Sequence, residues 1–295
     1  MAESGPTRTK TLRGEYRVRV AKPFRRLKGA VRTTVIDNDA LRIGSDVDAL
    51  VAAAAGGRAA DTSSGGTATI TAAADDIQPA SGFTFDTDAE AQDEFIIWLE
   101  RQANRGILEV TSRQRVRNGE HFTARYVRSA YSRGVQYADA RLHEEGVETP
   151  EASLQATFNQ PVHAATLEQL YTRSYDELAT VSSDMQTAVR RELGTGLSQG
   201  WNPRKTARNL NDRIDKIGIT DAERLARTET LHSHNSAAGR RYGEMGVEKV
   251  NVLTHTPCSI CTALEAQNPW PVEATPIVPD QSHPNCVCTI APVVT

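Results

Sequence analysis

The chain has 295 residues, a formal net charge of −3, 39% hydrophobic residues and only 5% aromatic residues. No stretch approaches the eighteen or more consecutive apolar residues of a membrane-spanning helix, which excludes an integral membrane protein and predicts a soluble one. The length is sufficient for one large domain or two small ones. Because the apolar fraction is below the globular average, we expect an elongated helical body whose apolar surface is partly completed by partner proteins.

The charge is distributed unevenly along the chain. Residues 1–33 contain ten lysines and arginines against two glutamates, a net charge of +8, so the remainder carries −11. This pattern predicts a basic arm on an acidic body. Lysine itself is scarce, with six residues in the whole chain. That bias is typical of a GC-rich genome and fits a salt-loving, haloarchaeal host.

The basic arm is expected to span residues 1–50. Residues 1–14 lack apolar periodicity and are predicted to be a flexible tail. From Pro23 onward apolar residues recur at helical spacing, which predicts an amphipathic helix with proline at its first position. The apolar positions are Phe24, Leu27, Val31 and Val35, and the basic ones are Arg25, Arg26, Lys28 and Arg32. Such a helix either docks with a solvated basic face, or brings its cations to DNA phosphates or to an acidic partner.

Residues 51–84 are rich in alanine, glycine and serine. Side chains of this kind bury too little apolar area to offset the ~1–2 kcal/mol per residue of conformational entropy lost on ordering. We therefore expect this segment to be a linker or mobile loop.

The helical body is expected to span residues 85–246. Its apolar residues recur at spacings of three and four, which is typical of helices buried along one face. The predicted helices are 88–104, 120–145, 162–197, 202–217 and 220–246. Asn202 before Pro203 is a helix start, and Thr220 with Glu223 indicates a capping box. Glu229 and its neighbour Arg227 are expected to fix the last helix to the C-terminal module through hydrogen bonds to backbone.

The C-terminal module, residues 247–295, contains every cysteine of the chain. Its possible metal ligands are the C-x2-C pair Cys258 and Cys261, and the H-x2-C-x-C group His283, Cys286 and Cys288. A C-x2-C turn directs two thiolates to one point and a distant pair completes a tetrahedral cage, so the spacing predicts one zinc ion. Two disulfides are the alternative, although no signal peptide or other cysteine indicates an oxidising compartment.

Two segments of the module have strand character, residues 250–253 and 286–292. In a strand, Cys286 and Cys288 would project from the same face. Either both would bind the metal, or one would bind and the other would pack as a thiol. A site closed by four protein ligands has no open coordination position, so we expect the zinc to stabilise the fold rather than to activate water.

The order of residues around the cysteines is more specific than their spacing. Ala226-Arg-Thr-Glu229 is followed by Asn235, Tyr242 and Gly246, then by the strand candidate, the C-x2-C pair and His283-Pro-Asn-Cys-Val-Cys288. In this order the residues resemble the C-terminal signature of the phage head-morphogenesis family, the minor head proteins similar to the F protein of phage Mu. The resemblance covers residues 160–292 well and the earlier part only loosely.

One departure from the family pattern affects the predicted metal site. The family usually carries an aspartate three residues before the first cysteine, where this chain has His255. The choice of ligands therefore stays open. The candidates are His255, Cys258, Cys261, His283, Cys286 and Cys288.

The resemblance implies a minor capsid protein of a tailed virus, a portal-associated virion protein that acts in head morphogenesis and viral capsid assembly. It implies as partners the portal protein, the major capsid protein or both, with packaged viral DNA as a further partner and no membrane. Several copies per particle are expected, in the capsid interior or near the portal, after assembly in the host cytoplasm. Some relatives carry an effector domain after the cysteine motif, but only residues 289–295 follow it here, so no enzyme is expected. The expected fold is mainly α, an elongated helical body with a small C-terminal α+β metal-stapled module.

Two other functions remain open. Pro257-Cys258-Ser-Ile-Cys261 matches the P-C-x-x-C of zinc-dependent nucleoside and nucleic-acid deaminases, and His143-Glu-Glu145 matches their H-x-E. This match leaves Cys286 and Cys288 unexplained. A zinc-containing nucleic-acid-binding protein is supported by the basic arm alone, because residues 251–295 contain no lysine or arginine.

Overall fold

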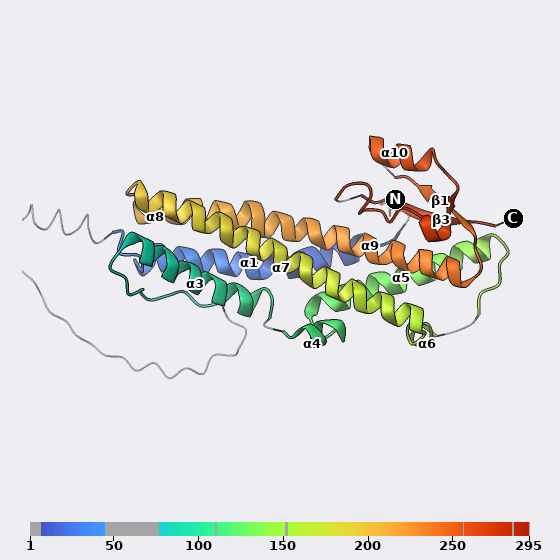
Figure 1. Ribbon diagram of the computed structural model, residues 1–295, viewed down its shortest axis with the longest axis horizontal. Coiled ribbons are helices and arrows are strands. Elements are labelled where there is room, and N and C mark those ends of the chain that lie inside the picture. The colour runs from blue at the N-terminus through green and yellow to red at the C-terminus, as the bar shows by residue number, and fades with distance from the viewer. Residues whose placement is uncertain are drawn as a thin grey trace, which may run out of the picture. The chain divides into compact units, whose positions relative to one another are not determined.

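The computed structural model describes residues 7–44, 77–109, 111–150, 153–255, 257–284 and 286–294. It is mainly helical, with a small antiparallel sheet near the C-terminus, which confirms the predicted fold class (Figure 1). In these ranges no helix combines the length and the apolar composition needed to cross a bilayer.

The chain forms two compact units, each made of segments distant in sequence. Unit 1 comprises Met1–Val20, Thr111–Ala179 and Asp221–Thr295, and unit 2 comprises Ala21–Val110 and Thr180–Thr220. Two long helices contribute residues to both units, α1 (Lys10–Arg32) and α7 (Pro161–Ser198).

Unit 2 is a set of helices around the apolar stripe that the sequence placed on the basic arm. Its other elements are η1 (Thr33–Asp37), α3 (Asp88–Gly106), α8 (Pro203–Arg213) and η2 (Ile214–Ile219). Phe24, Leu27 and Val31 are fully buried. The core is tight here, because a Cβ added at Gly218 would lie 2.5 Å from the Phe24 ring and 3.1 Å from the Met185 sulfur. The stripe is therefore part of the chain's own core and is not a free surface for a partner.

Helix α1 begins earlier than predicted, at Lys10 instead of Pro23, and Pro23 lies inside it. Residues 10–14, predicted to be a flexible tail, form its first turns. The reason is tertiary packing in unit 1. The Tyr16 ring stacks on Tyr126 at 4.4 Å between centroids, and its hydroxyl is 2.9 Å from that of Ser174. The glycine and charged residues of this segment obscure its helical apolar spacing. Burial of side chains such as Tyr16 stabilises the helix despite them.

The predicted linker is described only from residue 77 onward, and its residues 51–76 lie outside the described residues. The described part belongs to unit 2 and packs on its helices. The Ala80 amide donates to the Thr34 hydroxyl at 2.9 Å, and the Phe83 amide donates to the Ala40 carbonyl at 3.2 Å. The Phe83 ring also lies edge-on to Trp98 of α3. Residues 77–84 are thus not a loose linker.

The predicted helices over residues 88–104 and 162–197 are confirmed as α3 and α7, to within two residues. Thr87 and Glu90 form a capping box at the start of α3, which holds its first turn. The predicted start at Asn202 is also confirmed, since its side chain accepts from the Lys205 amide at 2.9 Å.

The predicted capping box at Thr220 is wrong. Thr220 has helical backbone angles, φ −64° and ψ −44°, and its hydroxyl donates to the Asp215 carbonyl at 2.9 Å. A cap would require non-helical angles. The backbone therefore passes through η2, a π-helical segment, into α9 (Thr220–Glu244) without a break.

In unit 1, the predicted helix over residues 120–145 is confirmed as α5 (Phe122–Glu144), which packs closely on α9. A Cβ added at Gly134 of α5 would lie 2.2 Å from the His234 carbonyl oxygen and 2.7 Å from the Ala237 Cβ. The glycine is what allows this approach. Two short helices not predicted from the sequence, α4 (Arg113–Arg117) and α6 (Leu154–Phe158), flank α5.

The C-terminal module is a three-stranded sheet with strand order β2-β1-β3. Its elements are β1 (Lys249–Leu253), α10 (Ser259–Glu265), β2 (Trp270–Pro271), η3 (Val272–Ala274) and β3 (Thr289–Val293). Val250 and Ile290 of the sheet pack on Leu142 of α5 and Tyr242 of α9, which seats the module on these helices (Figure 1). The strand over residues 250–253 is confirmed. The second strand begins only at Thr289, so Cys286 and Cys288 precede it and the argument from strand alternation does not hold.

Candidate metal centre

The C-x2-C pair is held by the start of α10. Cys258 is the N-cap residue, and its Sγ accepts a hydrogen bond from the Cys261 amide at 3.4 Å. Cys261 lies in the first turn and is buried. The helix start thus turns both sulfur atoms to one point, as the spacing predicted.

The second set of candidate ligands lies between the turn at residues 279–282 and β3. The Cys286 amide donates to the His283 carbonyl at 3.1 Å, and the Cys288 amide lies 3.5 Å from the Cys286 Sγ. Both cysteines are buried, while His283 is partly exposed. These local bonds fold the H-x2-C-x-C group back on itself.

The two sets meet, and we call the resulting group of residues the cysteine cluster: Cys258, Cys261, His283, Cys286 and Cys288. The donor atoms of Cys258, Cys261 and His283 lie within 4.8 Å of one another. The same holds for the donor atoms of Cys261, Cys286 and Cys288. The Cys261 Sγ lies 3.5 Å from that of Cys258 and 3.6 Å from that of Cys286. A disulfide would bring two sulfurs to about 2.05 Å, and all four cysteines are free. Thiolates on one tetrahedral zinc lie roughly 3.8 Å apart, given Zn–S bonds of about 2.3 Å. The cysteine cluster could therefore hold a metal ion.

The position of His255 distinguishes it from the other candidates. It follows β1, and its backbone hydrogen-bonds to the Cys288 thiol. Its imidazole belongs to neither group of donor atoms found in the described part of the chain. The structure thus gives His255 a backbone role beside the cysteine cluster.

The protonation of the cysteines differs because they hydrogen-bond to one another. The bond from Cys288 lowers the pKa of Cys286 to about 5, and the same bond together with burial raises the pKa of Cys288. The bond from the Cys261 amide lowers the pKa of Cys258. Both shifts favour the thiolate, which is the form of cysteine that binds a metal.

His283 is oriented by its own backbone. Its Nδ1 lies 2.8 Å from the Pro284 carbonyl oxygen, a bond that raises the pKa of His283. With Nδ1–H donating to this carbonyl, Nε2 is the nitrogen left to act as a ligand, an arrangement usual for metal-binding histidines.

Asn235 of α9 attaches the cysteine cluster to the helices. Its buried amide donates to the Val278 carbonyl at 2.8 Å and to the Cys288 carbonyl at 3.0 Å. Its oxygen accepts from the Thr289 hydroxyl at 2.9 Å. One side chain therefore fixes the segment before the turn and the segment after it. The place of Asn235 in the residue order before the cysteines does not by itself predict this role.

A charged network makes a second attachment. Arg173 of α7 pairs with buried Glu229 at 3.1 Å and with Asp280, in the loop before His283, at 2.9 Å. Glu229 thus helps to fix α9 to the module, but through the guanidinium of Arg173 and not, as expected, through bonds to backbone. The His232 Nδ1 lies 3.2 Å from the Asp280 Oδ1, to which Arg173 also donates at 3.0 Å.

The residues that matched a deaminase motif lie elsewhere in unit 1. His143 is in the last turn of α5 and Glu145 is the residue after it, and both are exposed. Neither belongs to the groups of possible metal ligands among the described residues.

No protein-family model matches the chain, and searches of the curated proteins and of the solved structures return no similar protein. The case for a function rests on the cysteine cluster and on the order of the residues around it.

Proposed function

We propose that this chain is a minor capsid protein of a tailed virus, in which a structural zinc ion holds the C-terminal module together. The observation that carries the proposal is the cysteine cluster, seated on α9 by Asn235. It occurs within a residue order that resembles the head-morphogenesis signature. The partners proposed are the portal protein and the major capsid protein, with packaged DNA as a further one.

Zinc is the metal that best fits the donors. Three thiolates with an imidazole, or four thiolates, form a soft set, which disfavours magnesium and calcium and suits tetrahedral zinc. The module has little core of its own, so metal ligation would supply much of its stability.

A structural role is favoured over catalysis because protein donors surround the site. Four ligands from the five residues of the cysteine cluster leave no position for a reactive water. A deaminase would also need a glutamate beside the metal as general acid and base. As a direct test, zinc-loaded protein should not deaminate cytidine or adenosine. Turnover that Glu145→Gln abolishes would refute the scaffold proposal.

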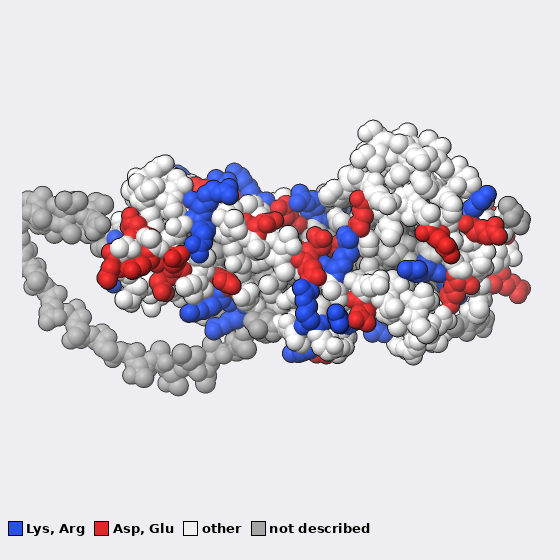
Figure 2. Space-filling model, in the orientation of Figure 1, with Lys and Arg blue, Asp and Glu red and all other residues white. Residues whose placement is uncertain are grey.

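A nucleic-acid-binding zinc module is the less favoured function. Phosphate binding requires clustered cations, but residues 251–295 contain no lysine or arginine. The region around α10 accordingly has few charged side chains on the face seen in Figure 2.

The first prediction concerns metal content. Protein purified under reducing conditions should contain about one zinc per chain by elemental analysis, and Cys258→Ser should lose most of it, because a hydroxyl is a poor zinc ligand. Ser259→Ala, a neighbouring change outside the cysteine cluster, is the matched control. Metal-free protein with four titratable thiols would end the zinc proposal.

Separate variants identify the fourth ligand beside Cys258, Cys261 and Cys286. If His283 is the ligand, His283→Gln should lower zinc affinity more than Cys288→Ser does, and the reverse holds if Cys288 is the ligand. His255→Gln should have little effect because its contact to the cysteine cluster is through backbone.

The role in the particle has its own test. Antibodies to this chain should detect it in gradient-purified particles, and deleting its gene should yield heads that lack DNA or fail to deliver it. Intact, infectious particles from the deletion strain would refute the assembly role, whatever the metal content of the protein.

A further inference from the structure

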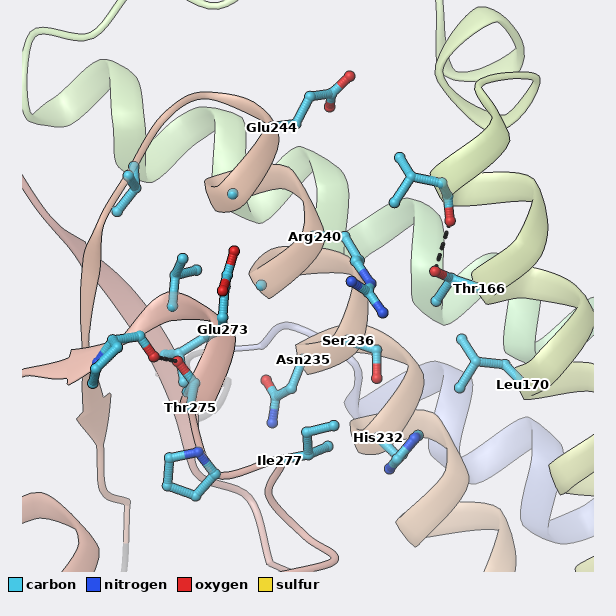
Figure 3. A pocket seen from close by; sticks show the side chains of 18 of the residues that line it. Thr166, Leu170, His232, Asn235, Ser236, Arg240, Glu244, Glu273, Thr275 and Ile277 are labelled. Carbon is cyan, nitrogen blue, oxygen red and sulfur yellow. Dashed lines mark hydrogen bonds between the residues drawn. The ribbon is translucent and has the colours of Figure 1, made fainter.

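A groove of about 910 Å³ lies in unit 1, separate from the cysteine cluster. α9 forms its floor, α7 forms one wall, and residues 271–277 form the other wall (Figure 3). None of the five residues of the cysteine cluster lines it.

Three glycines line the floor of the groove, Gly239 and Gly243 of α9 and Gly246 just after the end of the helix. A Cβ added at Gly243 or Gly246 would meet nothing within 4 Å, and one added at Gly239 would meet only the Ile290 δ-methyl, at 3.6 Å. The backbone of α9 is therefore open to close approach along the turn between Gly239 and Gly243.

The walls present apolar side chains to solvent. Val162 of α7 and Ile277 of the opposite wall are each 42% exposed, although both are large and apolar. Between them, Leu170 and Ile290 are buried at the bottom of the groove. Apolar surface on both sides of an open groove indicates that another apolar group covers it.

Four polar side chains of the groove are already hydrogen-bonded or ion-paired within the chain. The Thr166 hydroxyl donates to the Val162 carbonyl at 2.7 Å (Figure 3), and the Thr275 hydroxyl donates to the Pro271 carbonyl at 3.0 Å. Asn235 is engaged by the module backbone, and Arg173 by two carboxylates. A small polar ligand needs convergent donors and acceptors, so this groove is better suited to an occupant that binds through apolar contact.

The rim has an excess of negative charge. The exposed carboxylates of Glu248 and Glu273 lie on the rim with one exposed cation, Arg240, while the third exposed carboxylate, Glu244, is paired with Arg241. Charge complementarity therefore favours an occupant with basic residues beside its apolar ones.

We infer that this groove binds a peptide segment of a partner protein, in which two apolar side chains are flanked by lysine or arginine. The apolar side chains lie between Val162 and Ile277 against the glycine floor, and the cations face the acidic rim. This is the groove-docking mode of peptide recognition. The inference does not depend on the proposed function, since it uses neither the metal nor the virion.

A random 12-residue peptide library displayed on particles is the probe, selected on the full-length protein and depleted on Gly243→Leu. Leucine at position 243 fills the groove, and it should not disturb α9 because the space there is open. Gly14→Leu is the matched control, another helical glycine with nothing within 4 Å. Selected peptides should carry paired apolar residues and a net positive charge. Gly243→Leu should weaken the binding of a labelled selected peptide at least tenfold, and Gly14→Leu should leave it unchanged.

The charge of the rim is tested separately with the same peptide. Glu273→Lys should weaken binding several-fold at low salt and less at high salt, because screening removes the charge term. Glu145→Lys, an exposed change beyond the groove, should have no effect.

Three results would overturn the inference. The library could yield no peptide that prefers the wild-type protein to Gly243→Leu, or only acidic peptides. Alternatively, the wild-type protein could self-associate in a way that Gly243→Leu abolishes, which would make a second copy of this chain the occupant.

Discussion

His121 is the N-cap of α5 and is nearly fully buried, 3% exposed, between the rings of Phe122 and Tyr175. Burial lowers its pKa from 6.5 to about 4, and the nearby charge of Arg19 acts in the same direction. In the unfolded chain the imidazole takes up a proton near pH 6.5. Its contribution to stability is therefore full above pH 6.5 and is lost as the pH falls from there towards 4.

His121→Asn should remove this dependence while keeping the cap, since asparagine is among the best N-cap residues. The wild-type protein should lose up to about 3 kcal/mol more unfolding free energy between pH 7 and pH 4 than the variant. Urea denaturation at each pH measures the difference, and any acid loss of metal affects both proteins alike. Parallel pH profiles would mean that the pKa of His121 is the same in the folded and the unfolded chain.

Asn235 is the second residue whose replacement is informative. Asn235→Ala would leave the buried carbonyls of Val278 and Cys288 without donors, at a cost of about 1–3 kcal/mol for each such group. The expected result is a less stable module that releases zinc to a chelator at least several-fold faster. Asn159→Ala, at an exposed position, is the control and should release zinc at the wild-type rate. Equal release rates for the wild type, Asn235→Ala and Asn159→Ala would mean that the hydrogen bonds of Asn235 do not help the cysteine cluster to retain its metal.

The cysteine cluster could be predicted from the sequence because its members are close in sequence or share a known spacing. The attachment of the cluster could not. Arg173 and Asp280 are 107 residues apart, and no local pattern relates them. His255 was a candidate ligand because of its residue type and its position near the cysteines. It contacts the cysteine cluster through its backbone, which residue type alone cannot predict.

At the scale of elements, Gly134 sets the distance between α5 and α9. Gly134→Ala would push its methyl group into the His234 carbonyl, and we expect it to lower the unfolding free energy by about 1–3 kcal/mol, as overpacking does. Gly14→Ala, at an open position of α1, should instead raise it by up to about 1 kcal/mol, because alanine is the better helix former. Thermal and urea unfolding measure whether the changes in unfolding free energy of the two variants have opposite signs. If both variants gained stability, α5 and α9 would not pack as closely as described.

The long helices were predictable because their apolar spacing and capping residues agree, as at Thr87 and Asn202. The predictions failed where a local signal was overridden. Pro23 marked a helix start by its chemistry, but residues 10–22 are helical because Tyr16 and its neighbours are buried. Thr220 and Glu223 have the spacing of a capping box, but the backbone is already helical before them. Local sequence signals indicate where an end is possible, and packing decides whether the helix ends there.

At the scale of the whole molecule, the basic arm is not a separable tail, since residues 21–32 belong to the core of unit 2. Leu27→Asp should place a carboxylate at a fully buried site and unfold unit 2, with a large loss of helical circular dichroism. Lys22→Asp, on the exposed face of the same helix, should melt close to the wild-type temperature. A folded Leu27→Asp protein would mean that the apolar stripe is not part of the core of unit 2 and is available to a partner. The proposed contacts of the arm with DNA or capsid are thus better tested on its exposed cations than on the stripe.

The three tryptophans of the chain are divided between the two units. Trp98 and Trp201 belong to unit 2. Trp270 is in β2, where its indole nitrogen donates to the Leu264 carbonyl of α10 at 2.9 Å. With the first two replaced by phenylalanine, all indole emission would come from the module that contains the cysteine cluster. The protein thus carries an intrinsic optical reporter with which loss of the proposed metal can be followed apart from the melting of unit 2.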